Sequence, residues 1–392
     1  MNAKKTLKDK NHHRLSILYV LALLLAFSGA LPAYIQSNFL EQFVGVRTVS
    51  LFFVIANALS VVAILLFPAL IKNLTNYFLT KVVLALYLAS LLGLALAAEP
   101  IVALVSIALF TISTNLVWIN MDILVESFSD NKITGKIRTT YFTFINASWI
   151  ISPLLSSFLI SRGQYTLSFL IAGFMLVPFY LIFVYTGRKL KQAVKYQEEG
   201  LLLTLRKMWN NKNLRGIFFI ALLLQLFFNS AVVYIPLYLF QNLGMDWNSL
   251  GIVFSIMLIP FVLIEMPAGV FADRYGTKKI LAAGFTILTV SLFLFYYIAV
   301  PNIWLWALVL FISRIGAALV EAMRETYFFK IVDVESIGYI NIFRATAPLG
   351  YVLGSSLAIA ILCFFPINYV FLFFALIMLS GFGFIAALKD TK

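Results

Sequence analysis

Three charged residues share one face of a long apolar segment in the second half of the chain. Arg314 lies twelve residues into the segment 302–326, and Glu321 and Glu325 follow it seven and eleven positions later. These spacings place the three side chains on one side of a helix. An arginine can hold a carboxylate or a phosphate with two parallel hydrogen bonds, and carboxylates can pair with basic residues. The chemistry that these residue types favour is anion binding and ion pairing.

The elements that must position these residues are membrane-spanning helices. The chain of 392 residues is 62% hydrophobic and 11% charged, with a mean hydropathy of +0.98, whereas about a quarter of the residues of a soluble domain are charged. A helix needs about 20 apolar residues to cross a bilayer, and unpaired backbone groups in lipid force each span to be helical. We therefore expect an all-α membrane protein with twelve transmembrane helices, near residues 15–36, 48–70, 79–97, 101–125, 139–160, 165–185, 216–239, 250–270, 280–299, 302–326, 340–363 and 367–388.

Arg314 is expected close to the middle of the membrane, because twelve helical residues rise about 18 Å. An arginine there costs several kcal/mol unless it faces a partner or a water-filled cavity. We therefore predict that Arg314 binds substrate or takes part in gating; the alternative is a fixed ion pair that supports packing. Glu265, close to the end of a span, is a candidate proton carrier because low dielectric favours its neutral form. The alternative for Glu265 is an ion pair with the basic loop beside it.

The chain contains an internal repeat at an offset of 199 residues. The coinciding positions include Gly45 with Gly244, Pro68 with Pro267, Asp122 with Glu321 and Glu126 with Glu325. Two six-helix copies in the same orientation form a parallel repeat about an axis along the membrane normal. We expect an N-terminal half over 1–186, a cytoplasmic linker over 187–215 and a C-terminal half over 216–392.

The linker contains the stretch LLLTLRKMW, which has the pattern of an amphipathic helix on the inner leaflet. The side chains expected to face the lipid are Leu203, Met208 and Trp209, and those expected to face water are Arg206 and Lys207. A flexible linker is the alternative.

The net charge of +13 follows the membrane topology. Of the 29 Lys and Arg residues, only Arg47 and Arg162 fall in one set of loops, whereas the tail, the other loops and the C-terminus are basic. Basic loops mark the cytoplasmic side, so both termini are expected in the cytoplasm of a multi-pass protein of the plasma (inner) membrane. The charge is expected to contact anionic lipids of the inner leaflet and does not indicate nucleic acid binding.

The segment 265–279, EMPAGVFADRYGTKK, resembles the signature loop of the major facilitator superfamily, roughly G-x-x-x-D-R-x-G-[RK]-[RK]. The matching positions are Gly269, Asp273, Arg274, Gly276, Lys278 and Lys279. Together with the twelve spans and the repeat, the resemblance covers essentially the whole chain. It implies a secondary transporter in which two six-helix halves rock about a site near the midplane.

The resemblance also implies a gate on the cytoplasmic side. Asp273 and Arg274 would form its latch, with Arg274 meeting Glu321 or Glu325. The other gate candidates are Gly269, Gly276, Lys278, Asp122 and Glu126. Gly276 is expected to allow a tight turn with a positive φ. The corresponding loop of the first copy, PALIKNLTNYFLTKV, has no Asp-Arg pair, so the latch is one-sided; the alternative is that the loop only anchors the topology.

In the superfamily the central cavity is lined by spans 1, 4, 7 and 10 with help from 5, 8 and 11. The substrate-binding candidates on these spans, besides Arg314, are Asn115, Trp118, Asn146, Trp149, Gln225, Asn229 and Tyr234. For any single polar residue, helix–helix packing is the alternative. Trp304 and Trp306, near a span end, are expected in the interfacial aromatic belt.

Several classes of function are excluded or disfavoured. The sequence has no Walker motif, no metal-ligand cluster and no nucleophile paired with a base, and its two histidines lie in the N-terminal tail, so we expect neither an enzyme nor a cofactor or metal. We expect a monomeric secondary transporter of a small molecule, coupled to protons or another ion. An aromatic cavity with a few acids favours efflux of amphipathic or drug-like compounds, whereas Arg314 favours a carrier or importer of a small organic anion. A lipid flippase and a transport-dead, receptor-like protein are the alternatives from other classes.

Overall fold

All the regular structure is helical in the part of the chain that a computed structural model describes, residues 2–127, 134–162, 164–186, 201–332 and 337–389. The elements are α1 (Asn2–Ala33), α2 (Gln36–Glu41), α3 (Val46–Leu74), α4 (Asn76–Leu96), α5 (Pro100–Ser127), α6 (Thr134–Ile160), α7 (Tyr165–Thr186), α8 (Leu201–Asn210), α9 (Lys212–Asn229), the π-helical turn η1 (Ser230–Tyr234), α10 (Ile235–Leu237), the π-helical turn η2 (Tyr238–Asn242), α11 (Trp247–Tyr275), α12 (Thr277–Tyr297), α13 (Ile303–Ile331), α14 (Ile337–Arg344), α15 (Thr346–Leu362), α16 (Asn368–Met378) and α17 (Ser380–Ala387).

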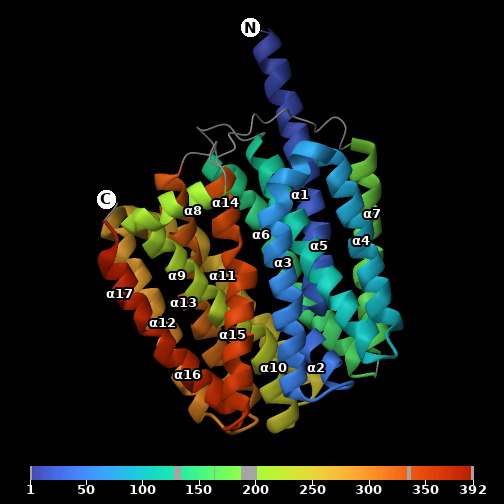
Figure 1. The fold of residues 1–392 in the computed structure, drawn as a ribbon, viewed down its shortest axis with the longest axis vertical. Helices are drawn as coiled ribbons and strands as arrows, with labels where there is room; N and C mark the ends of the chain where they lie inside the picture. Colours follow the sequence, from blue (N-terminus) through green and yellow to red (C-terminus); the bar gives the residue numbers. More distant parts are fainter. Residues whose placement is uncertain (1, 128–133, 163, 187–200, 333–336, 390–392) are drawn as a thin grey trace.

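Twelve segments among the described residues are long and apolar enough to cross a membrane, which confirms the all-α prediction. The first six spans gather on one side of the bundle and the last six on the other (Figure 1). We call α1 to α7 the N-terminal half and α9 to α17 the C-terminal half. Both chain termini lie at the same end of the bundle (Figure 1), the terminal end, and the far end is the opposite end. The linker 187–215 stays a prediction as a domain boundary, since residues 187–200 lie outside the described part.

The two halves meet along two helix pairs, α6 with α11 and α3 with α15. The first pair is closely packed at Gly251. A Cβ atom on this glycine would lie 2.7 Å from the Ser157 Cβ and 3.2 Å from the Pro153 carbonyl oxygen. Because such distances leave no room for a side chain, the glycine is what allows the two helices to approach.

Substitution of Gly251 by leucine is expected to push the halves apart. Overpacking of this kind costs about 1–3 kcal/mol, so the purified variant should unfold at a clearly lower temperature. The matched control is Gly383→Leu, because a Cβ at that helical glycine would meet nothing within 4 Å. Equal losses of thermal stability in the two variants would show that the close approach is unimportant.

Prolines interrupt three helices at positions that matter for the site. Pro32 lies in the last turn of α1, and the chain turns at Tyr34 before α2 begins. Pro236 lies between the π-helical turns η1 and η2. Pro348 cannot donate a hydrogen bond to the carbonyl group four residues earlier, which belongs to Arg344, and α14 ends at this residue.

Helix α8 forms at the predicted place but is oriented differently. Met208 is 3% exposed and Thr204 is 1% exposed, so Met208 faces the protein and not the lipid. Leu202, Leu203 and Trp209 are exposed. The prediction for Met208 was wrong because α8 packs on α9 and α14, contacts that a helical pattern alone does not contain.

Candidate functional site

Arg314 is enclosed near the middle of α13. Only 1% of its surface is exposed. Its Nη2 lies 3.6 Å from the Met257 sulfur, and its guanidinium carbon lies 5.4 and 5.8 Å from the ring centroids of Phe227 and Phe228. Thioether sulfur is a weak hydrogen-bond acceptor, and aromatic rings attract cations through their faces. These neighbours therefore shield the charge without neutralising it.

Two donors of this guanidinium, Nε and Nη1, have no hydrogen-bond partner among the described atoms. The Tyr34 hydroxyl interacts with the guanidinium, and Tyr351 and Glu321 act on it electrostatically. A buried donor without a partner costs about 1–3 kcal/mol. A guanidinium in this condition can accept a carboxylate or a phosphate with charge-assisted hydrogen bonds.

Tyr34 brings the N-terminal half to the arginine. Its ring stacks on Phe254 of α11 with centroids 5.1 Å apart, and it meets Trp149 of α6 edge-on at 6.2 Å. Trp149, a predicted site residue, thus joins the surroundings of Arg314 through Tyr34. Sequence reasoning missed Tyr34 and Tyr351. The available signal for Tyr34 was Pro32, which predicts a helix break within a few residues.

The other predicted substrate residues form contacts between neighbouring helices. Asn229 donates to the Ser355 hydroxyl at 3.0 Å, the Tyr234 and Ser50 hydroxyls share a hydrogen bond of 2.8 Å, and Asn115 donates to the Ser60 hydroxyl at 3.0 Å. Gln225 packs against Gly350, Trp118 meets Tyr141 edge-on, and Asn146 is partly buried on α6. Of this group, the Tyr234–Ser50 contact joins the two halves. A substrate role for any of them stays a prediction.

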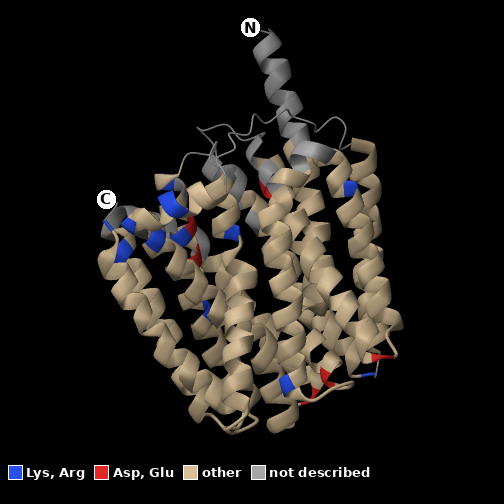
Figure 2. Ribbon diagram, viewed as in Figure 1, with Lys and Arg blue, Asp and Glu red and all other residues tan. Residues whose placement is uncertain are grey.

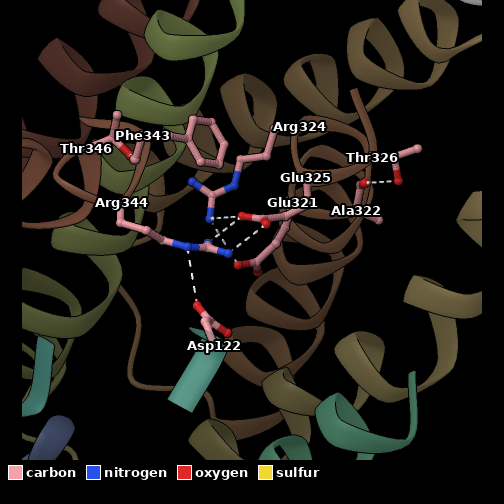
Figure 3. Close-up of polar contacts among 9 residues, drawn as sticks. All are labelled: Asp122, Glu321, Ala322, Arg324, Glu325, Thr326, Phe343, Arg344 and Thr346. Atoms are coloured by element: carbon pink, nitrogen blue, oxygen red, sulfur yellow. Dashed lines mark hydrogen bonds and ion pairs between the residues drawn. The ribbon is translucent and has the colours of Figure 1, made fainter. Parts of the chain in front are cut away.

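An ion-pair network joins the halves at the terminal end (Figure 3). Arg344 of α14 donates from Nη1 and Nη2 to the two carboxylate oxygens of Glu325 at 2.7 and 3.0 Å. Its Nε lies 3.4 Å from Oδ2 of Asp122, which α5 of the N-terminal half carries. Arg324 donates to Glu321 at 3.3 Å and lies 3.7 Å from Glu325. Asp122 and Glu325, one predicted acid from each copy, thus both pair with Arg344, a residue that sequence reasoning missed.

The signature loop is described only in part. The described part does not include the side chains of Glu126, Glu265, Asp273 and Arg274. The surroundings of Gly269 are not described either. Gly276 has a φ of 87°, which confirms the predicted positive φ. Lys278 donates to the carbonyl oxygens of Ala386 and Leu388 at 3.0 and 2.9 Å. Its described contacts therefore supply hydrogen bonds to carbonyl groups at the end of α17.

Further contacts join the halves at the opposite end. Gln241 donates to the Glu41 carboxylate at 2.6 Å, Arg47 donates from Nε to the Leu362 carbonyl oxygen at 2.9 Å, and the Tyr165 ring meets Trp247 edge-on at 6.1 Å. Partial burial raises the pKa of Glu41. The described contacts therefore bridge both ends of the bundle, and Arg314 lies between them.

The described residues contain no group of three or more His, Cys, Asp or Glu side chains that could hold a metal ion. The described site offers one buried cation, a set of aromatic rings and hydroxyl groups. These groups can bind and enclose a small molecule.

Comparisons with known proteins agree with this architecture. The family model described as Major Facilitator Superfamily matches residues 135–261 and 217–392. The chain therefore belongs to the major facilitator superfamily, and it is a multi-pass secondary transporter and not an enzyme. No curated protein sequence gives a significant match.

Two solved structures are similar over nearly their whole length. The nucleoside transporter NupG is 15% identical with a TM-score of 0.74, and the alignment covers 96% of this chain and 100% of that chain. A POT family transporter in complex with 5-aminolevulinic acid is 12% identical with a TM-score of 0.78, and 95% of each chain is covered. At these identities the likeness concerns the fold alone.

Proposed function

We propose that this transporter carries a small organic anion, which binds at Arg314 between the two halves. The observation that carries the proposal is the buried guanidinium with two unpaired donors. A charge that is buried without a full set of partners is unfavourable in the substrate-free protein. A bound carboxylate or phosphate would supply the missing acceptors.

The surroundings of Arg314 support an anion with an apolar or aromatic part. Phe227 and Phe228 lie on one side of the guanidinium, and Tyr34 stacks with Phe254 beside it. Aromatic rings bury apolar ligand surface, and tyrosine hydroxyls add hydrogen bonds at the rim. A lipophilic cation is disfavoured at this position because it would meet the positive charge of Arg314. The organic-anion alternative is therefore preferred here to efflux of cationic drug-like compounds.

The terminal end is assigned to the cytoplasm. Lys and Arg residues gather there, as Figure 2 shows, whereas Arg47 and Arg162 lie in loops at the opposite end. This is the distribution expected from the excess of Lys and Arg in cytoplasmic loops. Both termini and helix α8 would then lie on the cytoplasmic side of the plasma membrane.

Alternating access would use the network on Arg344 as the cytoplasmic gate. Asp122 belongs to one half and Arg344 to the other, so their contact must break when the cytoplasmic side opens. Asp273 and Arg274 remain gate candidates through the signature loop, and Glu265 remains the candidate proton carrier. The direction of net transport depends on whether the proton and the substrate cross the membrane in the same direction or in opposite directions.

Counterflow into proteoliposomes tests the proposal. Liposomes loaded with one unlabelled compound are diluted into trace labelled compound, with benzoate, a sugar phosphate, uridine and tetraphenylphosphonium as the panel. We expect exchange of the anions. Accumulation of the labelled anion under an inward or an outward proton gradient distinguishes proton symport from proton antiport. Exchange of uridine or tetraphenylphosphonium alone would contradict the anion site. Movement of labelled phospholipid would support the flippase alternative. No movement of any compound would support the transport-dead alternative.

A further inference from the structure

Helix α8 presents an apolar edge that neither the fold nor the transport cycle uses. Leu202 is 82% exposed and Trp209 is 52% exposed. Leu201, Leu203 and Leu205 are exposed as well. On a helical projection, residues 201, 202, 205 and 209 lie within one sector, next to the face that Thr204 and Met208 bury. An apolar edge of this size beside a transmembrane bundle is suited to burial in lipid.

Basic groups border this edge. Arg206 and Lys212 are exposed. Arg215 donates to the Trp209 carbonyl oxygen at 3.3 Å, and its guanidinium lies 5.9 Å from the Trp209 ring centroid. Trp209 in turn meets Phe219 of α9 edge-on at 5.8 Å. The tryptophan is thus held at the boundary between apolar and basic surface, where indole rings settle in membranes.

The buried face of α8 rests on α14, the helix that carries Arg344 of the ion-pair network. A Cβ on Gly338 of α14 would lie 3.1 Å from both Cγ2 and Oγ1 of Thr204. Arg344 ends the same short helix, and Phe343 beside it stacks on Phe328 of α13 with centroids 4.0 Å apart. A displacement of α8 therefore acts directly on α14.

We infer that α8 and the first turn of α9 bind anionic phospholipid headgroups, and that this binding steadies α14 with the Arg344–Asp122 contact formed. The acyl chains would cover the apolar edge, and the phosphate groups would meet Arg206 and Lys212. The inference about lipid binding is independent of the substrate at Arg314, whereas its effect on Arg344 uses the gate described under the proposed function.

Lipid binding is tested by thermal unfolding of the full-length protein in detergent. Phosphatidylglycerol, added in micellar form, should raise the unfolding temperature more than phosphatidylcholine does, and the difference should shrink as salt screens the charges. The R206Q/K212Q variant should lose at least half of this difference. The L202Q variant should lose part of it through the apolar edge. The control K330Q/K389Q removes two exposed basic residues from the same end of the bundle and should keep the wild-type difference.

Several outcomes would overturn the inference. An equal response to the two lipids, or an equal loss in R206Q/K212Q and the control, would mean that α8 is not a lipid site. An equal response to inorganic phosphate would mean that the surface binds small anions. If R206Q/K212Q unfolds in detergent, retention of phosphatidylglycerol in native mass spectra of the L202Q variant against wild type decides the question.

The link to the gate needs a separate readout. Spin labels at positions 78 and 330, both exposed and both near the terminal end, report the distance between the halves in nanodiscs. Phosphatidylglycerol should favour the short distance in wild type and lose this effect in Gly338→Val, which separates α8 from α14. If that variant keeps the lipid effect on the distance, the proposed coupling is wrong while lipid binding stands.

Discussion

Replacement of Arg314 by glutamine is expected to abolish anion binding and, at the same time, to make the substrate-free protein more stable. Both effects follow from the unpaired donors Nε and Nη1. With a substrate bound, loss of one member of a buried charge pair costs about 2–5 kcal/mol, so the dissociation constant should rise by a factor of about 100 or more. Without a substrate, the variant removes a buried charge that lacks a complete set of partners, and the unfolding temperature should rise.

The two measurements use one preparation. Thermal unfolding with and without the anion that exchanges best in proteoliposomes gives the stability of each state, and the shift at saturating ligand gives the binding. Arg314→Lys keeps the charge but loses the planar pair of donors, so it should bind with intermediate affinity. Arg162→Gln, a charge loss at the opposite end of the bundle, is the control and should behave as wild type.

The combination separates a binding role from a structural one. If Arg314 only supports packing, Arg314→Gln will lower the unfolding temperature and leave the anion shift in place. If Arg314→Gln both lowers the unfolding temperature and loses the anion shift, a folding defect could explain the result. Arg314→Lys then tests the binding role. A folded Arg314→Lys variant that binds the anion as wild type does would rule out the two-donor interaction.

The spans could be predicted from the sequence because lipid imposes the same demand on every segment. Each crossing must be apolar, long enough and helical, and these requirements act on neighbouring residues. The breaks inside spans were less predictable. Residues 340–363 were predicted as one span, and a single candidate span, Gly338–Leu362, is present there, but a break at Ala345 divides it into α14 and α15. The proline that causes the break is visible in the sequence, but its effect on the Arg344 side chain depends on α5 and α13.

In the candidate site, too, the sequence predicts properties of single helices better than contacts between helices. Arg314 could be singled out as a candidate site residue, because a cation deep in a span is costly wherever the helices pack. Tyr34 and Tyr351 were not, since they approach Arg314 from other helices. Trp306 was expected in the interfacial belt but is fully buried, where its ring meets Tyr238 at 5.9 Å and Nε1 donates to the Val300 carbonyl oxygen. These errors concern contacts between helices, which hydropathy does not encode.

The second large effect is expected at the network on Arg344. Asp122→Asn removes the described ion pair between the halves and leaves the pair of Arg344 with Glu325 inside the C-terminal half. Arg344→Gln removes both and leaves Glu321, Glu325 and Asp122 with less positive charge nearby. Both variants should shift the protein toward a state that is open at the terminal end, and Arg344→Gln should shift it further. Because the groups are about a fifth exposed, we expect about 1–2 kcal/mol for the contact, or a population change of about tenfold.

Distance measurements between spin labels at positions 78 and 330 report this shift, with Cys363 replaced by serine because it is exposed and unbridged. The double variant Asp122→Asn/Arg344→Gln completes a cycle that isolates the coupling between the two residues. If the contact holds the end closed, the double variant will open by less than the sum of the two single effects. Strictly additive shifts, or unchanged distances in Asp122→Asn, would mean that the contact is incidental.

The position of Arg344 in the chain would allow the proposed gate contact to control a large movement. The residue ends α14 at the break before α15, and α15 packs along α3 of the other half. A change in the pairing of Arg344 therefore acts at a joint between the short helix α14 and the long helix α15, which lies at the interface of the halves. Turnover should fall about tenfold in Arg344→Gln while the equilibrium affinity for the substrate stays within about threefold, since a population change of this size alters access more than binding. A loss of affinity equal to the loss of turnover would place Arg344 in the binding site and not in the gate.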